Sequence, residues 1–381
     1  MINHINSKLT HHYISMASFK SSISLIVLIS LLHFEFSSAV KGGYWTPDNG
    51  MEASDIDSTL FTHLFCAFAN FDKQTNQITV PSGCDTFPQA IRGKNSAVKA
   101  ILSIGGGTVP STDFNTMASQ PSSRKAFIDS SISLAISNGY DGLDLDWEQQ
   151  TQPDEMNNMA TLLNEWRAAI NSNGQSLILT AALHYSPIVS QAVTFPAQAI
   201  SDNLDWVNVM AYDFWAPGWP GPDPILARPH ASLNDPTSGN PSGSSGISAW
   251  INAGVPANKL VLGVPYYGHA WKLADANNNG ILAPVVATNG QDVSFDPFGN
   301  EETPTYKQIK SLIPQNTYDD TYVTNYFSSG TTWVAYDDTD SISRKVDYAK
   351  TTGLLGYFAW RIDQDQDNWA LSTLASQRWG A

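Results

Sequence analysis

Three acidic side chains alternate with apolar ones in the segment 140–148, which reads YDGLDLDWE. Neighbouring side chains of a β-strand point to opposite faces, so a strand here places Asp144, Asp146 and Glu148 on one face. Carboxylates this close together cannot all ionise where the dielectric constant is low, so at least one should keep its proton at neutral pH. A carboxyl group with a raised pKa is what general acid catalysis of glycosidic cleavage needs. We expect Glu148, the outermost of the three, to be that acid, with Asp146 raising its pKa.

Two alternatives remain for this cluster: a metal site, or a purely structural group of acids. Metal sites usually recruit histidine or dispersed oxygen ligands, and the segment has none nearby in sequence. We therefore favour catalysis and expect neither a metal ion nor a cofactor. His184 and His230 have no carboxylate, serine or cysteine partner at a suggestive spacing, so we predict no catalytic role for either.

The elements that must position these residues are short apolar strands that alternate with helical patterns. Near-continuous apolar runs are typical of parallel strands that are buried on both faces. Helices are clearest after Pro121 and after Pro153, where apolar residues recur at helical spacing and Gly139 and Gly174 follow as stops. Eight strands with helical crossovers predict an α/β fold, a (β/α)8 TIM barrel. The predicted strands cover 40–45, 61–69, 98–104, 142–146, 177–183, 206–210, 260–264 and 355–360.

The regular spacing breaks after the seventh strand. Residues 269–338 are rich in Asn, Gly, Pro and Thr, with a helical pattern over 305–312 and a strand-like piece over 331–336. A segment this long is too large for a simple loop. We therefore predict a small α+β insertion at 269–338, between strand 7 and helix 7, in a catalytic barrel made of 40–268 and 339–381.

The composition limits the class of partner. The chain has 381 residues and a formal net charge of −15, which excludes nucleic acid and other anionic polymers as partners. A neutral or amino-bearing polymer is compatible with that charge, and some of the 12 Trp side chains are candidates for stacking on flat, neutral sugar rings. We expect the protein to be a monomer.

The N-terminal residues have the pattern of a targeting segment. Lys20 precedes an apolar run over 23–32 that is too short to span a bilayer, and small residues follow at 37–39. This predicts a signal peptide over 1–39 and a mature chain that starts near Val40; a buried first helix is the less favoured alternative. We expect a protein secreted to the extracellular space or cell wall rather than the vacuole, without membrane association.

The two cysteines do not form a disulfide framework. Cys66 lies inside an apolar run, which favours a buried free thiol, while a bond between Cys66 and Cys84 is the alternative for a secreted protein.

Four motifs in order resemble those of family-18 glycosyl hydrolases, and the similarity over 40–379 is greatest with plant class V chitinases. The pattern DGxDxDxE at 141–148 is similar to the family signature, SIGG at 103–106 to a second motif and MAYD at 210–213 to a third. Trp360 ends the eighth predicted strand, where the family places a tryptophan beneath the bound sugar. The resemblance implies an endo-acting chitinase without a cofactor, which takes chitin or chito-oligosaccharides as its substrate and acts in plant defence.

The resemblance also implies retaining catalysis in which the substrate supplies the nucleophile. Glu148 would protonate the leaving oxygen while the acetamido carbonyl of the same sugar attacks the anomeric carbon. Asp146 would orient the acetamido group, Asp144 would share a proton with Asp146, and Tyr212 would hydrogen-bond the acetamido oxygen. Asp213 would contact the distorted sugar.

Further residues are candidates for substrate binding. Trp360 is expected to be a sugar platform, and Met210 belongs to the third motif. Gly105 and Gly106 are expected to allow close backbone approach at the mouth. For Tyr44 and Tyr267, direct contact with the sugar and support of its neighbours remain equally open.

The sequence departs from the class V pattern directly after the acid. Gln149 and Gln150 stand where the pattern usually has Tyr-Pro, which puts substrate length and acceptor preference in doubt. Two alternatives to a chitinase therefore stay open. One is a weak or inactive chitinase-like lectin that binds N-acetylglucosamine or other glycans, and the other is a hydrolase of modified lipo-chito-oligosaccharides.

Overall fold

The computed structural model describes residues 39–174, 176–219, 225–237, 239–287, 293–313 and 315–380. The predicted signal peptide over 1–39 lies outside these residues, except for its last position. Within the described ranges, none of the helices combines the length and the apolar character that crossing a membrane requires.

The predicted barrel of eight parallel strands is confirmed. The strand order is β1-β13-β8-β7-β6-β5-β4-β2, and pairing of β1 with β2 closes the ring. No boundary differs from the predicted one by more than two residues, and the small differences arise because strand ends depend on pairing rather than on composition. The barrel strands are β1 (Val40–Trp45), β2 (His63–Phe71), β4 (Lys99–Gly105), β5 (Gly142–Asp146), β6 (Ile178–His184), β7 (Trp206–Met210), β8 (Leu260–Pro265) and β13 (Gly356–Trp360).

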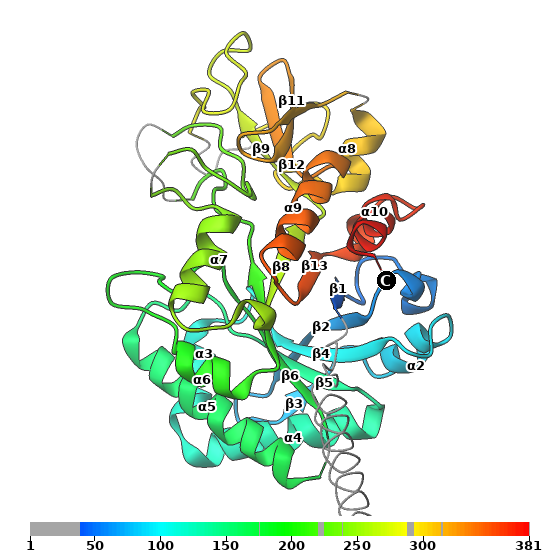
Figure 1. Cartoon of the computed structure of the whole chain (residues 1–381), viewed down its shortest axis with the longest axis vertical. Helices are drawn as coiled ribbons and strands as arrows, with labels where there is room; N and C mark the ends of the chain where they lie inside the picture. Colours follow the sequence, from blue (N-terminus) through cyan, green and yellow to red (C-terminus); the bar gives the residue numbers. More distant parts are fainter. Residues whose placement is uncertain are drawn as a thin grey trace, which may run out of the picture. The chain divides into compact units, whose positions relative to one another are not determined.

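Helices cover the outside of this ring (Figure 1). The predicted stop at Gly139 is the left-handed end of α4, with φ of 77°, a conformation that glycine adopts without steric penalty. The helices are α2 (Phe87–Arg92), α3 (Ser111–Ser119), α4 (Pro121–Asn138), α5 (Pro153–Ser172), α6 (Ala197–Asn203), α7 (Gly243–Asn252), α9 (Thr339–Thr351) and α10 (Ala370–Trp379).

The apolar face of β5 packs into the helix layer and thereby fixes which way its carboxylates point. Leu143, Leu145 and Trp147 are all buried. The indole of Trp147 stacks on Phe114 of α3 at 5.4 Å between ring centroids, and its Nε1 donates to Ser111 Oγ at 2.7 Å. The alternating acidic side chains consequently face the interior of the barrel.

A second, antiparallel sheet lies between β8 and α9, where the α+β insertion is predicted. Its strand order is β10-β11-β12-β9, and α8 (Tyr306–Leu312) belongs to the same segment. Figure 1 shows this sheet and α8 beyond the ends of α7 and α9. The strands are β9 (Gly268–Lys272), β10 (Thr317–Asp319), β11 (Thr324–Ser329) and β12 (Thr332–Tyr336).

The free thiol predicted at Cys66 is wrong, because Cys66 and Cys84 form a disulfide. The short strand β3 (Ile78–Thr79) pairs antiparallel with the end of β2, Asn70 lying opposite Thr79. This pairing folds the following turn back along β2 and brings the two Cα atoms to 5.8 Å, within the range that a disulfide spans. Composition could not show this, because the pairing depends on a two-residue strand.

Candidate active site

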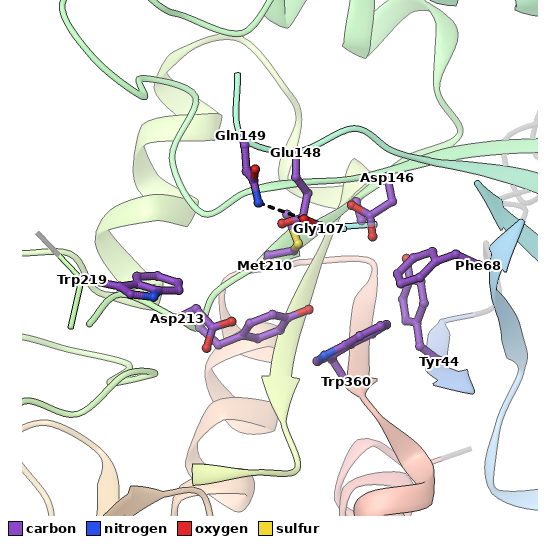
Figure 2. A pocket seen from close by; sticks show the side chains of 12 residues that line it. Tyr44, Phe68, Gly107, Asp146, Glu148, Gln149, Met210, Asp213, Trp219 and Trp360 are labelled. Atoms are coloured by element: carbon purple, nitrogen blue, oxygen red, sulfur yellow. Dashed lines mark hydrogen bonds between the residues drawn. The ribbon is translucent and has the colours of Figure 1, made fainter. Parts of the chain in front are cut away.

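A cavity opens at the carboxyl ends of the barrel strands, where barrel enzymes build their sites. Seven of the predicted site residues line it, and Figure 2 shows Glu148 and Asp146 on one wall with Trp360 and Asp213 facing them. The lining comprises Tyr44, Phe68, Gly107, Asp146, Glu148, Gln149, Ala182, Met210, Tyr212, Asp213, Trp219 and Trp360.

Asp144, Asp146 and Glu148 form an acidic column along β5 and the residues that follow it. Asp144 lies at the base of this column, is fully buried and accepts three hydroxyl hydrogen bonds. Ser103 Oγ and Tyr44 Oη donate to its Oδ2 at 2.7 and 2.9 Å, and Thr180 Oγ1 donates to its Oδ1 at 2.6 Å. Asn208 Nδ2 donates to Tyr44 Oη at 2.8 Å, which leaves the phenolic hydrogen free to point at Asp144. Burial raises the pKa of Asp144, and the hydroxyl donors oppose that rise. The site therefore surrounds Asp144 with groups that stabilise its anion.

Asp146 has the opposite environment. Its Oδ1 is buried and has no hydrogen-bond partner among the described residues. Burial, followed by the charges of Glu148 and Asp144, raises the pKa of Asp146 well above its usual range. The surroundings of Asp146 therefore favour its protonated form more than those of Asp144 do.

Glu148 is the outermost carboxyl group, and its pKa is raised to about 7 by burial and then by the charge of Asp213. Gly107 lies beside its carboxyl group. A Cβ atom at Gly107 would lie 3.1 Å from Glu148 Oε1, a tight contact that would make the carboxyl group shift by a few tenths of an ångström. Glu148 therefore combines a titration range near neutral pH with direct access to the cavity, as a general acid needs.

Gln149 holds the loop after the acid to the neighbouring loop, which follows β4. Its Nε2 donates to the carbonyl oxygen of Gly107 at 2.9 Å, and its φ of 61° is a left-handed conformation. Its neighbour Gln150 is buried, and its side chain donates back to the carbonyl of Trp147. Of the two glutamines that depart from the class V pattern, Gln149 thus joins two loops at the cavity wall, and Gln150 holds its own loop together.

The aromatic candidates surround the acids. Trp360 and Phe68 stack at 5.4 Å between ring centroids, and Trp360 meets Tyr44 edge-on at 5.5 Å. Burial, followed by the charge of Asp146, raises the pKa of Tyr212 well above its usual range, so Tyr212 keeps its hydroxyl hydrogen. Together these rings provide apolar walls and one hydroxyl donor.

Gly105 and Gly106 are outside the cavity lining, and their neighbour Gly107 occupies the place predicted for them. A Cβ atom at Gly105 would lie 2.1 Å from the carbonyl oxygen of Asp146, and one at Gly106 would lie 2.5 Å from the Phe68 ring. These two glycines allow the end of β4 to approach β5 and Phe68, and so support the site from behind.

Asp213 is the centre of a network that sequence reasoning missed in part. Its Oδ1 accepts from Tyr267 Oη at 2.7 Å and lies 2.9 Å from His269 Nε2 and 3.3 Å from His230 Nδ1. Burial opposes ionisation of Asp213, yet hydrogen bonds from His230 and His269 hold its pKa below the usual range. The expectation that His230 has no carboxylate partner is wrong. The partners lie 17 and 56 residues from Asp213 in sequence, so only the closed barrel brings them together.

Asp213, His230 and His269 are also the one group of potential metal ligands within the described ranges. One ligand atom from each side chain lies within 4.8 Å of the other two.

Comparison with known proteins identifies one family throughout. The sequence profile of glycosyl hydrolases family 18 matches residues 41–365. A class V chitinase from Arabidopsis thaliana is 47% identical over 376 residues, which cover 94% of this chain and 96% of that one. The crystal structure of class V chitinase from Nicotiana tobaccum, also solved for a variant in complex with NAG4, has 46% identity and a TM-score of 0.84, and the match covers 90% of this chain and 99% of that chain. A chitinase-like agglutinin from Robinia pseudoacacia has 46% identity and a TM-score of 0.80, over 90% of this chain and 100% of that chain.

Proposed function

The chain belongs to family 18 of the glycosyl hydrolases, and we propose that it is an endo-acting chitinase that hydrolyses the β-1,4 bonds of chitin and N-acetylchito-oligosaccharides. The observation that carries this proposal is the acidic column of β5, in which each carboxyl group has a different environment. Asp144 is surrounded by hydroxyl donors, Asp146 is buried without a partner at Oδ1, and Glu148 faces the cavity with a pKa of about 7.

In the first step the bond between the anomeric carbon and the leaving oxygen breaks. Glu148 gives its proton to that oxygen, and the acetamido carbonyl oxygen of the same sugar forms a bond to the anomeric carbon. The proton of Asp146 passes to Asp144, which leaves an anion at Asp146 beside the acetamido N–H and the positive oxazolinium ring. Tyr212, which keeps its hydroxyl hydrogen, donates to the acetamido oxygen.

In the second step water attacks the anomeric carbon. The Glu148 carboxylate accepts a proton from that water, the bond to the acetamido oxygen breaks, and the configuration of the sugar is retained. The aromatic wall of Trp360 supports the ring beneath the reacting bond. Selectivity for N-acetyl sugars follows, because the attacking atom belongs to the N-acetyl group.

Digestion of N-acetylchitohexaose tests the proposal. We expect the parent protein to release shorter oligomers and Glu148→Gln to lose at least about 1000-fold in rate, since both proton transfers require this group. Asp129→Asn is the matched control, because it removes an exposed carboxylate far from the cavity and should leave the rate unchanged. Binding of the hexamer without release of products would reject the enzyme and identify a sugar-binding protein, as the name of the Robinia agglutinin suggests for that relative.

A second experiment, with lipidated and unmodified oligomers, tests which substrate the protein prefers. A relative from Medicago truncatula that is 37% identical over 90% of both chains is named a Nod factor hydrolase. If this protein instead acts on modified oligomers, it should hydrolyse a lipidated chito-oligosaccharide faster than an unmodified one of the same length. The chitinase proposal expects the unmodified hexamer to be cleaved at least as fast.

We also propose that the protein is a secreted monomer with a role in plant defence. The disulfide between Cys66 and Cys84 supports secretion, because such bonds persist mainly in oxidising compartments. Expression of the full chain in plant cells should deliver a monomer to the extracellular medium with an N-terminus near Val40. Retention in the vacuole, or an uncleaved N-terminus, would contradict this.

A further inference from the structure

The two histidines beside Asp213 have no part in the acid–base steps proposed above, although both contact a carboxylate that lines the cavity. His230 is 1% exposed and His269 is 5% exposed, and their rings lie 4.5 Å apart between centroids. The carboxylate that they face is accessible, since the Asp213 side chain is 38% exposed and lines the cavity. In Figure 2 Asp213 lies between Trp219 and Trp360, which also line the cavity.

When the His230 ring is neutral, it cannot donate a hydrogen bond to both of its polar neighbours. Its Nε2 lies 3.3 Å from the carbonyl oxygen of Tyr267, and its Nδ1 lies 3.3 Å from Asp213 Oδ1. A neutral imidazole has a single N–H group, so it donates to one of these acceptors and presents a lone pair to the other. Donation to the Tyr267 carbonyl leaves the Nδ1 lone pair facing the carboxylate. A cation between them removes the conflict.

The geometry points to a site for Zn²⁺, or a similar divalent transition metal, formed by Asp213, His230 and His269. Zinc commonly takes two imidazoles and one carboxylate and leaves its fourth position to water. Bonds of about 2.0–2.1 Å in a tetrahedral arrangement place neighbouring ligand atoms about 3.3 Å apart. The observed separations from Asp213 Oδ1 are 2.9 Å to His269 Nε2 and 3.3 Å to His230 Nδ1. When a metal ion takes the Nδ1 lone pair of His230, its Nε2–H can donate to the Tyr267 carbonyl behind it, the outer hydrogen bond that is usual for metal-bound histidine.

A metal ion here would oppose the binding of sugar. It would occupy the carboxylate that lines the cavity and weaken the hydrogen bond from Tyr267 to Asp213. Bound Zn²⁺ is therefore inhibitory, competes with the oligosaccharide, and is removed by a chelator.

Equilibrium dialysis of the full chain against ZnCl₂ tests the site without reference to hydrolysis. We expect one equivalent of Zn²⁺ per chain. Co²⁺ should occupy the same site and give the visible absorption of a four-coordinate complex. In His230→Asn and His269→Gln an amide takes the place of the nitrogen that faces Asp213, and Zn²⁺ affinity should fall at least about 100-fold, more than when a residue behind a ligand is changed. His184→Asn is the control, because His184 contacts Ser186 and lies outside the cluster.

Kinetics supply the second readout. Zn²⁺ should raise the KM for N-acetylchitohexaose in the parent protein, leave kcat unchanged, and lose its effect after addition of EDTA. Absence of saturable Zn²⁺ binding, or equal affinity in the parent and in a folded cluster variant, would overturn the site. If the protein fails to hydrolyse the hexamer, the proposed function fails, whereas the dialysis result still decides this inference.

Discussion

At the scale of single residues, the site depends on giving three neighbouring carboxyl groups different surroundings. Thr180 is the donor to Asp144 Oδ1, and both residues are fully buried. We predict that Thr180→Val destabilises the protein by about 1–3 kcal/mol, because a buried carboxylate loses a partner that water cannot replace. Urea unfolding measures the change. Thr180→Ser keeps the hydroxyl and should recover most of the loss; equal destabilisation by both would assign the effect to packing instead.

Glu148 gives a prediction about pH. Its pKa rises from 4.5 in the unfolded chain to about 7 in the folded one. Below pH 4.5 both states hold the proton, whereas above pH 7 folding keeps a carboxylate in surroundings that disfavour it, so stability falls between these values. The shift corresponds to about 3 kcal/mol. Glu148→Gln, which cannot ionise, should therefore be more stable than the parent at pH 8 by up to about 3 kcal/mol and nearly equal at pH 4.

Urea unfolding at the two pH values measures this difference, with Asp129→Asn, which removes an exposed carboxylate, as the control. An equal gain in stability at pH 4 and pH 8 would mean that Glu148→Gln acts through packing and not through the charge of the carboxylate.

The rate of hydrolysis should also depend on the protonation of Glu148. The acid step needs protonated Glu148, so the rate should fall as the pH rises through about 7. A pH–rate profile on N-acetylchitohexaose measures this limb. A rate that stays constant up to pH 9 would exclude Glu148 as the group that gives the proton.

At the scale of elements, the disulfide fastens the turn before α2 to a central barrel strand. Cys66 and Cys84 are 18 residues apart, and closing a loop of this length in the unfolded chain is worth about 3 kcal/mol. We predict that the double change Cys66→Ala, Cys84→Ala lowers the free energy of unfolding by about that amount and leaves the kcat of the folded protein unchanged, since neither residue lines the cavity. Denaturant unfolding and steady-state kinetics measure the two quantities; a large loss of kcat at full folding would contradict a purely structural role.

Patterns within one element could be predicted from the sequence, whereas contacts between distant elements could not. Alternation in 140–148 gives the facing of Asp144, Asp146 and Glu148, because a strand has a fixed period of two. The pairing of Cys66 with Cys84 and the contact of His230 with Asp213 depend on how separate loops fold together. The role of Gly107 in place of Gly105 and Gly106 follows from the position of one side chain, Glu148, which no spacing reveals.

At the scale of the whole molecule, the net charge of −15 should not affect the binding of an uncharged substrate. A neutral oligomer gains nothing from long-range attraction, so salt should have little effect on its capture. We predict that kcat/KM for N-acetylchitohexaose changes less than about twofold between about 0.02 M and about 0.5 M NaCl. Partly deacetylated oligomers carry positive charge, and their affinity should fall with salt. A strong salt dependence for the neutral hexamer would indicate charged contacts outside the cavity described here.

The unpartnered oxygen of Asp146 also bears on how such a chain evolves. A buried acid that lacks a partner strains the fold, so many replacements at this position relieve the strain while they end turnover. Such replacements would give more stable variants that are catalytically inactive and still bind sugar. Keeping Asp146 therefore costs this fold stability that a neutral side chain at the same position would not cost.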